Sequence, residues 1–170
     1  EDNATTKQGV FLGRMLFYET KLSSSKTISC ASCHQQKLAF TDGKAFSSGI
    51  DNMPTKRSSM SLANLLWVRN FFWDGRAKGL EDQAKFPLND PHEMGNYLEQ
   101  AVKDLQKTKE YPLLFKAAFG TTEITEDRIA KAIATFERSL ISPPSRFDKF
   151  VSGKRNALTD AEVRGLHLFR

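Results

Sequence analysis

One short motif, Cys30-Ala31-Ser32-Cys33-His34, restricts the fold of this chain more than any other feature. It has the form C-x-x-C-H, which is the attachment signature of a c-type haem. Two thiols three positions apart on one helical turn can each add to a vinyl group of the porphyrin, and the imidazole that follows can ligate the iron. Because the chain has no other cysteine, the motif predicts covalently attached haem with His34 as its proximal ligand.

Two other uses of a C-x-x-C pair fit the sequence less well. A thioredoxin-like redox pair belongs to a strand–helix context in a βαβ unit, and no such pattern surrounds Cys30. A zinc site needs a second pair of ligands at close spacing, whereas the remaining histidines, His92 and His167, stand alone and far apart. We therefore interpret His92 as an exposed turn residue and His167 as a structural residue.

Composition and charge narrow the classes of partner. A 39% hydrophobic content over 170 residues is enough for one packed domain. The net charge of +5 is scattered and includes no Lys/Arg run, which argues against nucleic-acid binding. A basic face could attract an acidic redox partner, although a solvated surface is the commoner meaning of such charge. No apolar run is long enough to span a membrane.

Helical periodicity runs through the chain and no strand pattern is convincing, so we predict an all-α fold. The spacing of apolar and capping residues predicts helices over 7–18, 61–68, 80–86, 95–107, 111–119, 125–140 and 159–170. Pro87 is expected to end the third of these helices. Residues 35–59 lack periodicity, and so long a loop in a compact domain indicates a functional role or ordering by the haem.

The end of the sequence predicts a second unit. Ser142-Pro143-Pro144-Ser145 is typical of a linker. Thr159 and Glu162 then form a capping box for a helix that stops abruptly at Arg170. We therefore divide the chain into a haem domain at 1–145 and, at 146–170, a linker with the first helix of a second domain, and we expect the sequence to be part of a longer protein.

From Leu12 to Gly95 the chain resembles the bacterial di-haem cytochrome c peroxidases and the related MauG proteins. The resemblance rests on three segments, LGRMLFYETKLSSSKTISCASCH, FTDG at 40–43 and FFWDGRAKGLEDQAKFPLNDPHEMG at 71–95. The segment LTDAEVRGLHLFR at 158–170 is similar to the lead-in to the second haem domain of that family. The resemblance implies a cytochrome c-like helical haem domain, the N-terminal one of two.

In such peroxidases the N-terminal haem reacts with peroxide, and a second haem, outside this sequence, stores and relays an electron. By resemblance, Cys30, Cys33 and His34 hold the reactive haem. Trp73 matches the tryptophan between the two haems, and its oxidisable indole suits electron relay. Arg76, in the same segment, is expected to pair with a haem propionate.

Two further residues match the distal side of the family's reactive haem. Gln83 and Glu93 lie ten and twenty positions beyond Trp73 and correspond to its glutamine and glutamate. Cleavage of a peroxide O–O bond needs a base that takes a proton from one oxygen and delivers it to the leaving oxygen. Glu93 suits that role, while Gln83 can orient peroxide without charge.

Two positions depart from the family pattern. Where well-studied peroxidases have a histidine as sixth iron ligand, this chain has Ile50, which cannot ligate iron. The resting site is then five-coordinate or water-bound, unless Met53 or Met60 supplies a thioether. Ser58 replaces an asparagine that helps bind calcium between the domains, which puts calcium in doubt, although backbone carbonyls and water can complete such a site.

The resemblance implies a haem c enzyme that reduces hydrogen peroxide to water, with electrons from a small cytochrome c or cupredoxin through the second haem. One alternative is a MauG-like oxidase that modifies a partner protein, and another is an electron-transfer cytochrome with a methionine ligand. A homodimer also stays open. Since thioether attachment of haem occurs outside the bacterial inner membrane, we expect a periplasmic protein whose signal peptide is absent from this sequence.

Overall fold

The computed structural model describes residues 3–95 and 97–170, and it is helical as predicted. The α-helices are α1 (Lys7–Phe17), α2 (Cys30–Cys33), α3 (Leu80–Asn89), α4 (Leu98–Gln106), α5 (Tyr111–Phe119), α6 (Glu126–Arg138), α7 (Arg146–Val151) and α8 (Asp160–Phe169). Single 3₁₀ turns are η1 (Thr20–Leu22), η2 (Gln36–Leu38), η3 (Ile50–Asn52), η4 (Leu65–Trp67) and η5 (Arg155–Ala157). Extended pairing within the described ranges is limited to isolated bridges, so the all-α prediction is confirmed.

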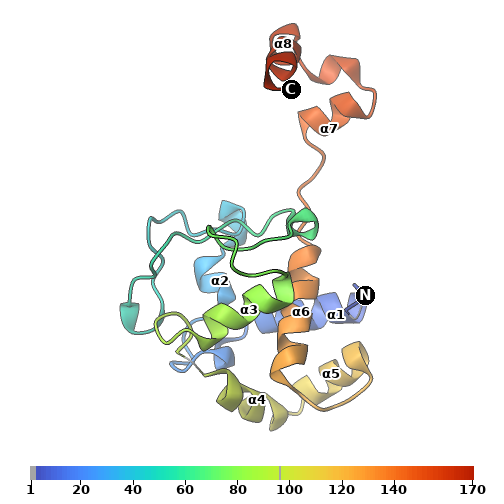
Figure 1. The fold of residues 1–170 in the computed structure, drawn as a ribbon. Helices are drawn as coiled ribbons and strands as arrows, with labels where there is room; N and C mark the ends of the chain where they lie inside the picture. Colours follow the sequence, from blue (N-terminus) through green and yellow to red (C-terminus); the bar gives the residue numbers. More distant parts are fainter. Residues whose placement is uncertain (1–2, 96) are drawn as a thin grey trace.

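Helices α1 and α6 pack against each other at the centre of the main body (Figure 1). Their crossing depends on Gly13, because a Cβ there would lie 1.9 Å from the carbonyl oxygen of Ala132. The close approach buries Leu12 of α1 and Ile129 of α6 completely. The α6 helix begins at the predicted cap, where the Thr125 hydroxyl accepts a hydrogen bond from the Arg128 N–H at 3.2 Å.

The remaining core surrounds this pair. Leu98 and Leu105 of α4 and Phe115 of α5 are almost fully buried in the same apolar cluster. Helix α3 packs along α6 and runs through Pro87 to Asn89, so the prediction that Pro87 ends the helix was wrong. Pro87 has no N–H to bond the carbonyl of Gln83, but its ring fixes a helical φ, and the chain stays helical for two more residues.

The segment between α2 and α3 is irregular, as predicted for its first part. The predicted helix at 61–68 is absent, and only η4 forms there, because Asn64 before it has a left-handed φ of 64°. Seven described non-glycine residues have positive φ, and six of them lie between Ala39 and Phe72. This path is held by turns and side chains instead of a regular helical ladder.

Beyond α6 the chain leaves the main body in an extended stretch, and α7, η5 and α8 form a small separate unit (Figure 1). Arg146 of α7 pairs with the Glu162 carboxylate through two bonds of 2.6 Å. The predicted capping box of Thr159 and Glu162 is present at the start of α8. Leu168 and Phe169 at the end of α8 are each 90% exposed. Helix α7 lies in the segment that the sequence marked as linker.

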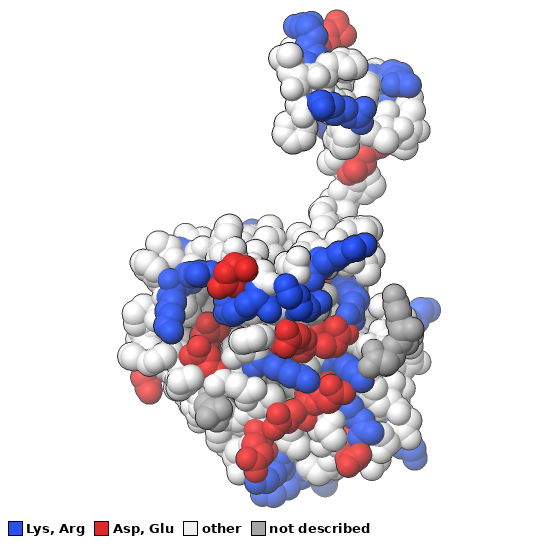
Figure 2. Space-filling view, viewed as in Figure 1, with Lys and Arg blue, Asp and Glu red and all other residues white. Residues whose placement is uncertain are grey.

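Charged side chains of both signs are interspersed on the face drawn in Figure 2, without a continuous basic tract. This distribution agrees with the scattered charge of the sequence. Within the part of the chain that the structure describes, every helix is too short or too polar to cross a membrane.

Candidate haem site

The C-x-x-C-H motif forms a single helical turn with its histidine directly behind it. Ser29 and Ser32 cap α2 reciprocally, which fixes the turn that carries Cys30 and Cys33. The His34 Nδ1 lies 2.8 Å from the carbonyl oxygen of Phe40. Since a carbonyl only accepts hydrogen bonds, Nδ1 carries the proton and Nε2 keeps its lone pair. Burial lowers the pKa of His34 and keeps the imidazole in the neutral form that ligates iron.

A cavity of about 710 Å³ opens beside this turn, within the usual size of a cofactor pocket, ~300–1,000 Å³. Its walls come from α2, α3, α6 and the irregular segment between α2 and α3. Apolar side chains supply much of the lining, among them Ile28, Leu62, Leu65, Phe71, Phe72 and Ile133. A large apolar cavity next to both thiols and the imidazole fits a covalently attached porphyrin.

The thiols are partly buried, and the residues around them favour haem over a zinc site. Burial, reinforced by the nearby Glu137 carboxylate, raises the pKa of Cys30 to about 12. Burial also raises the pKa of Cys33. A structural zinc site needs four ligands, and the described residues contain no cluster of three or more His, Cys, Asp or Glu side chains that could hold a metal ion.

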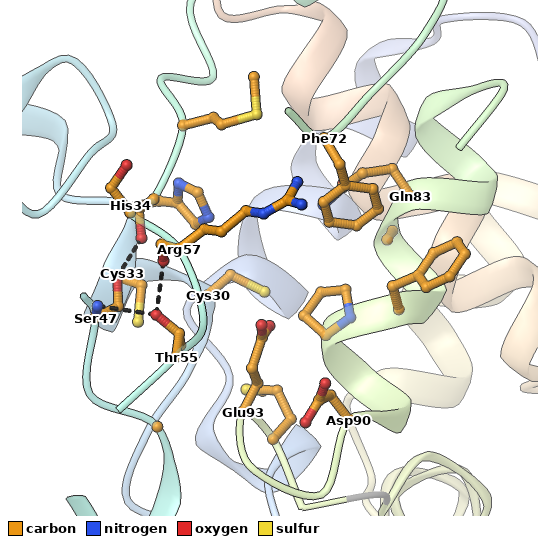
Figure 3. A pocket seen from close by; sticks show the side chains of 18 of the residues that line it. Cys30, Cys33, His34, Ser47, Thr55, Arg57, Phe72, Gln83, Asp90 and Glu93 are labelled. Carbon is orange, nitrogen blue, oxygen red and sulfur yellow. Dashed lines mark hydrogen bonds between the residues drawn. The ribbon is translucent and has the colours of Figure 1, made fainter. Parts of the chain in front are cut away.

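The predicted distal residues line the same cavity as the haem motif. Figure 3 shows His34 and Cys33 on one side, Gln83 of α3 on the opposite side, and Glu93 pointing into the space between them. Burial and the neighbouring Asp90 raise the pKa of Glu93, while Arg76 lowers it. The fold thus brings together residues that are separated by about sixty positions in the sequence.

Trp73 and Arg76 lie at the rim of the cavity. Trp73 is 64% exposed, and its Nε1 donates to the Ser58 carbonyl at 3.4 Å. The Arg76 guanidinium stacks 3.6 Å from the centre of the Phe72 ring and bonds to both Asp74 carboxylate oxygens at 3.0 Å. Arg76 therefore lines the cavity, as a propionate partner would, and is already paired with Asp74.

Of the three residues considered for the sixth iron position, Met53 and Met60 line the cavity and Ile50 does not. The Ile50 N–H donates to the Glu93 carbonyl at 3.1 Å, and the Ile50 side chain lies near Gly95, outside the cavity lining. Met53 and Met60 both contribute to the lining. A histidine-type ligand is therefore absent at Ile50, while two thioethers lie in the cavity wall.

Arg57 and Glu137 are among the charged residues of the cavity lining that were not singled out from the sequence. Arg57 donates to Asp74 at 3.1 Å, and its guanidinium extends across the cavity in Figure 3. Glu137 lines the cavity from α6 and is only 4% exposed. Its signal in the sequence was a carboxylate four positions after Ile133, on the apolar face of the helix. His92 is exposed in a turn, as predicted, and His167 is exposed on α8.

The helical fold and the cavity beside the C-x-x-C-H turn fit a c-type haem domain, and Gln83 and Glu93 line that cavity. The family model for di-haem cytochrome c peroxidase matches residues 7–156, so the chain belongs to the di-haem cytochrome c peroxidase and MauG family. The resemblance recognised in the sequence is therefore confirmed, and the family's cofactor is haem c.

Individual relatives fall into both branches of the family. The chain is 43% identical over 166 residues to a cytochrome c551 peroxidase of Nitrosomonas europaea, covering 94% of this chain and 48% of the relative. It is 38% identical to the methylamine utilization protein MauG of Methylorubrum extorquens, covering 98% and 48%. A solved MauG-like protein associated with microbial copper homeostasis superposes with a TM-score of 0.88 at 36% identity, covering 99% and 50%. The chain thus spans about half the length of these relatives.

Proposed function

We propose that this chain is the peroxide-reacting haem domain of a cytochrome c peroxidase. The observation that carries the proposal is that Gln83 and Glu93 line the same cavity as Cys30, Cys33 and His34. A haem held at the motif would thus have an amide and a carboxyl group within its own pocket. The carboxyl group can supply the proton-transfer base that cleavage of hydrogen peroxide needs, and the amide can hydrogen-bond to peroxide.

Glu93, Gln83 and His34 have different roles in the proposed reaction. When bound, haem supplies the iron and the electrons that break the O–O bond of peroxide. Glu93 acts as the base, accepting a proton from one peroxide oxygen and returning it to the other, which leaves as water. Gln83 orients peroxide through its amide, and the neutral His34 would hold the iron of a bound haem through its Nε2 lone pair.

Residues at the rim of the cavity would neutralise the haem propionates and pass electrons to the haem. Arg57 and Arg76 converge on Asp74 at distances of 3.0–3.1 Å, and two guanidinium groups that share one carboxylate can also neutralise propionates. The exposed indole of Trp73 is the relay toward a second haem in a following domain. Ile50 cannot ligate iron, so no histidine at this position would compete with peroxide for a bound haem.

The test is the substitution Glu93→Gln in the haem-loaded protein, followed by rapid mixing with hydrogen peroxide. We expect the haem spectral change to slow by ~10²–10⁴-fold, because a glutamine cannot accept the proton. In the unsubstituted protein, the rate should rise with pH through a pKa above the ordinary 4.5 of a glutamate, since only the ionised carboxylate is a base.

Glu99→Gln is the matched control, because it makes the same change on the exposed face of α4. An unchanged rate in Glu93→Gln would contradict the assignment of the base. A slowed rate in both variants would also contradict it, since the effect would then follow the loss of any carboxylate.

A MauG-like oxidase is the second candidate, and it is favoured by the superposition on a MauG-like structure with a TM-score of 0.88. Rapid turnover with a reduced small cytochrome c or a cupredoxin would support the peroxidase, whereas slow turnover with oxidation of a protein substrate would support the oxidase. A plain electron-transfer cytochrome would instead show the absorption band of iron ligated by Met53 or Met60.

The proposal extends to the whole protein. Residues 1–145 would form the first haem domain and residues 146–170 the beginning of a second one. We place such a protein in the bacterial periplasm, with hydrogen peroxide and a small redox protein as its partners. Ser58 leaves a calcium ion between the domains as a weaker part of the proposal.

A further inference from the structure

Glu137 is a buried acid in the wall of the haem cavity to which the proposed peroxide chemistry assigns no role. Its side chain is 4% exposed, and its Oε2 has no hydrogen-bond partner. An unpartnered buried carboxylate is expensive, because neither water nor a donor compensates its charge. Glu137 therefore retains a proton to unusually high pH, and burial raises its pKa to about 8.

The surroundings of Glu137 offer no full compensation for a negative charge. Arg138, on the same helix, lowers the pKa of Glu137. The Arg138 Nη2 bonds both carboxylate oxygens of Glu81 of α3 at 2.5 and 2.7 Å, while its buried Nη1 has no hydrogen-bond partner. Glu81 itself raises the pKa of Glu137. From α2, the Cys30 thiol faces it closely enough that the Glu137 carboxylate raises the pKa of that thiol. Cys30 becomes an uncharged thioether when haem is attached.

The other elements that pack against this end of α6 contribute apolar side chains. Phe17 of α1 and Leu65 of η4 pack with Phe136 and Cys30 in one cluster. Among the described residues, the ionisable groups that act on Glu137 are therefore Arg138, Glu81 and Cys30. A change of charge in the cavity would therefore act on the Glu137 carboxyl group, whose Oε2 has no hydrogen-bonded counter-ion.

We propose that Glu137 is the proton-holding residue of the haem cavity, taking up a proton when the haem is reduced and releasing it when the haem is oxidised. Reduction adds one electron to the iron and removes the positive charge that the ferric porphyrin carries. The Glu137 carboxylate then binds one proton from solvent, so that charge and protons balance. The proposal rests on haem at Cys30 and Cys33, but it requires no reaction with peroxide.

The direction of the coupling follows from Coulomb's law. A ferric haem attracts the carboxylate and lowers the pKa of Glu137, whereas a neutral ferrous haem lets burial raise that pKa again. We expect the two acid constants to differ about tenfold, which corresponds to about 59 mV for a one-electron couple. The reduction potential should be flat at low pH, fall as pH rises near the pKa of Glu137, and become flat again.

The experiment is a spectroelectrochemical titration of the haem-loaded protein between roughly pH 6 and pH 10, followed at the haem attached to Cys30 and Cys33. The proposal expects the fall in potential with rising pH in the unsubstituted protein and its loss in Glu137→Gln. A potential that is independent of pH, or the same slope in Glu137→Gln, would overturn it. Because no peroxide is present, this result is separate from that of the Glu93→Gln test.

Glu81→Gln gives a second and directional test. Removing the negative charge of Glu81 frees Arg138 to act on Glu137, which should move the falling part of the curve to lower pH. A curve that stays in place would assign the titration to another group. A structural role for Glu137 predicts no such displacement.

A measurement on the unsubstituted protein covers the case in which Glu137→Gln fails to keep haem. The infrared difference spectrum between the reduced and oxidised forms should contain a carboxylic acid C=O band, sensitive to exchange into D₂O, that appears on reduction near pH 8. The absence of that band would overturn the proposal.

Discussion

Two halves of the main body are stabilised in different ways. The helical framework, formed by α1, α4, α5 and α6, buries its own apolar side chains in one cluster. The loop wall, formed by residues 35–79, encloses the haem cavity and contains most of the positive-φ residues of the chain. The framework therefore covers most of its own apolar surface, with Ile133 and Glu137 of α6 reaching the cavity. The inner face of the loop wall becomes covered only when a group fills the cavity.

The first prediction concerns this dependence directly and has the largest expected effect. Replacing Cys30 and Cys33 by Ser should abolish covalent haem attachment and raise amide hydrogen exchange in the loop wall by roughly 1,000-fold, as expected on losing a tightly held ligand. Mass spectrometry of exchanging peptides measures the effect. Peptides of α6 serve as the internal control and should change far less.

Equal acceleration of exchange in α6 and in residues 35–79 would contradict the claim that the framework and the loop wall depend differently on the haem. It would mean that the two regions unfold as one cooperative unit, so that the haem stabilises the framework as strongly as the wall. No acceleration in either region would mean that the loop wall is held by its own turns.

The second prediction acts on the framework alone. Gly13→Ala should destabilise the protein by about 3 kcal/mol, because its Cβ would overlap the Ala132 carbonyl oxygen at 1.9 Å and force α1 away from α6. Gly165→Ala is the matched control, since a Cβ on Gly165 of α8 meets nothing within 4 Å. Denaturant unfolding followed by circular dichroism measures both.

Alanine favours a helix over glycine, so Gly165→Ala should be neutral or slightly stabilising. The same result at Gly13 would show that the crossing of α1 and α6 can widen without loss, and the framework would then be looser than its burial indicates.

The contrast between framework and wall also explains what could be read from the sequence. The helices at 7–18, 111–119 and 125–140 were predictable within a few residues, because helical periodicity and caps such as Thr125 are local signals. The helix predicted at 61–68 failed because apolar residues at Leu62 and Leu65 face a cavity instead of lining a helix stripe. Periodicity carries no information about a surface that a cofactor covers.

The residues of the site also differ in how far the sequence could predict them. Cys30, Cys33 and His34 were predictable because the chemistry requires them in one turn. Gln83 and Glu93 came from a family resemblance, since nothing local distinguishes them from ordinary helix and turn residues. Glu137 and Arg57 were not identified from the sequence. They become cavity residues only through the folding of distant segments against each other, and no local pattern marks this.

The third prediction tests the buried carboxyl group that the framework places in the cavity wall. Folding raises the pKa of Glu137 from 4.5 to about 8, so the folded protein binds more protons than the unfolded chain between these values. Stability should therefore fall as pH rises through this range, on the order of 2 kcal/mol between about pH 6 and pH 8. Glu137→Gln should remove that fall.

Thermal unfolding at a series of pH values measures this effect, and Glu126→Gln is the control because it removes an exposed carboxylate from the same helix. If Glu137→Gln and the unsubstituted protein lose stability in parallel, the buried carboxyl group is not the source. The framework would then be insensitive to charge at the cavity.

The smallest effect is expected at the end of α6 that lies far from the cavity. Thr125→Ala removes the side chain that caps the Arg128 N–H and should cost about 1 kcal/mol of stability. Thr122→Ala, at an exposed position just before the helix, is the control and should have little effect. Because three turns of helix separate the cap from Glu137, the haem spectrum and reduction potential should not change. A change in either would mean that fraying at one end of α6 reaches the cavity, and the framework could no longer be treated as a rigid support for the loop wall.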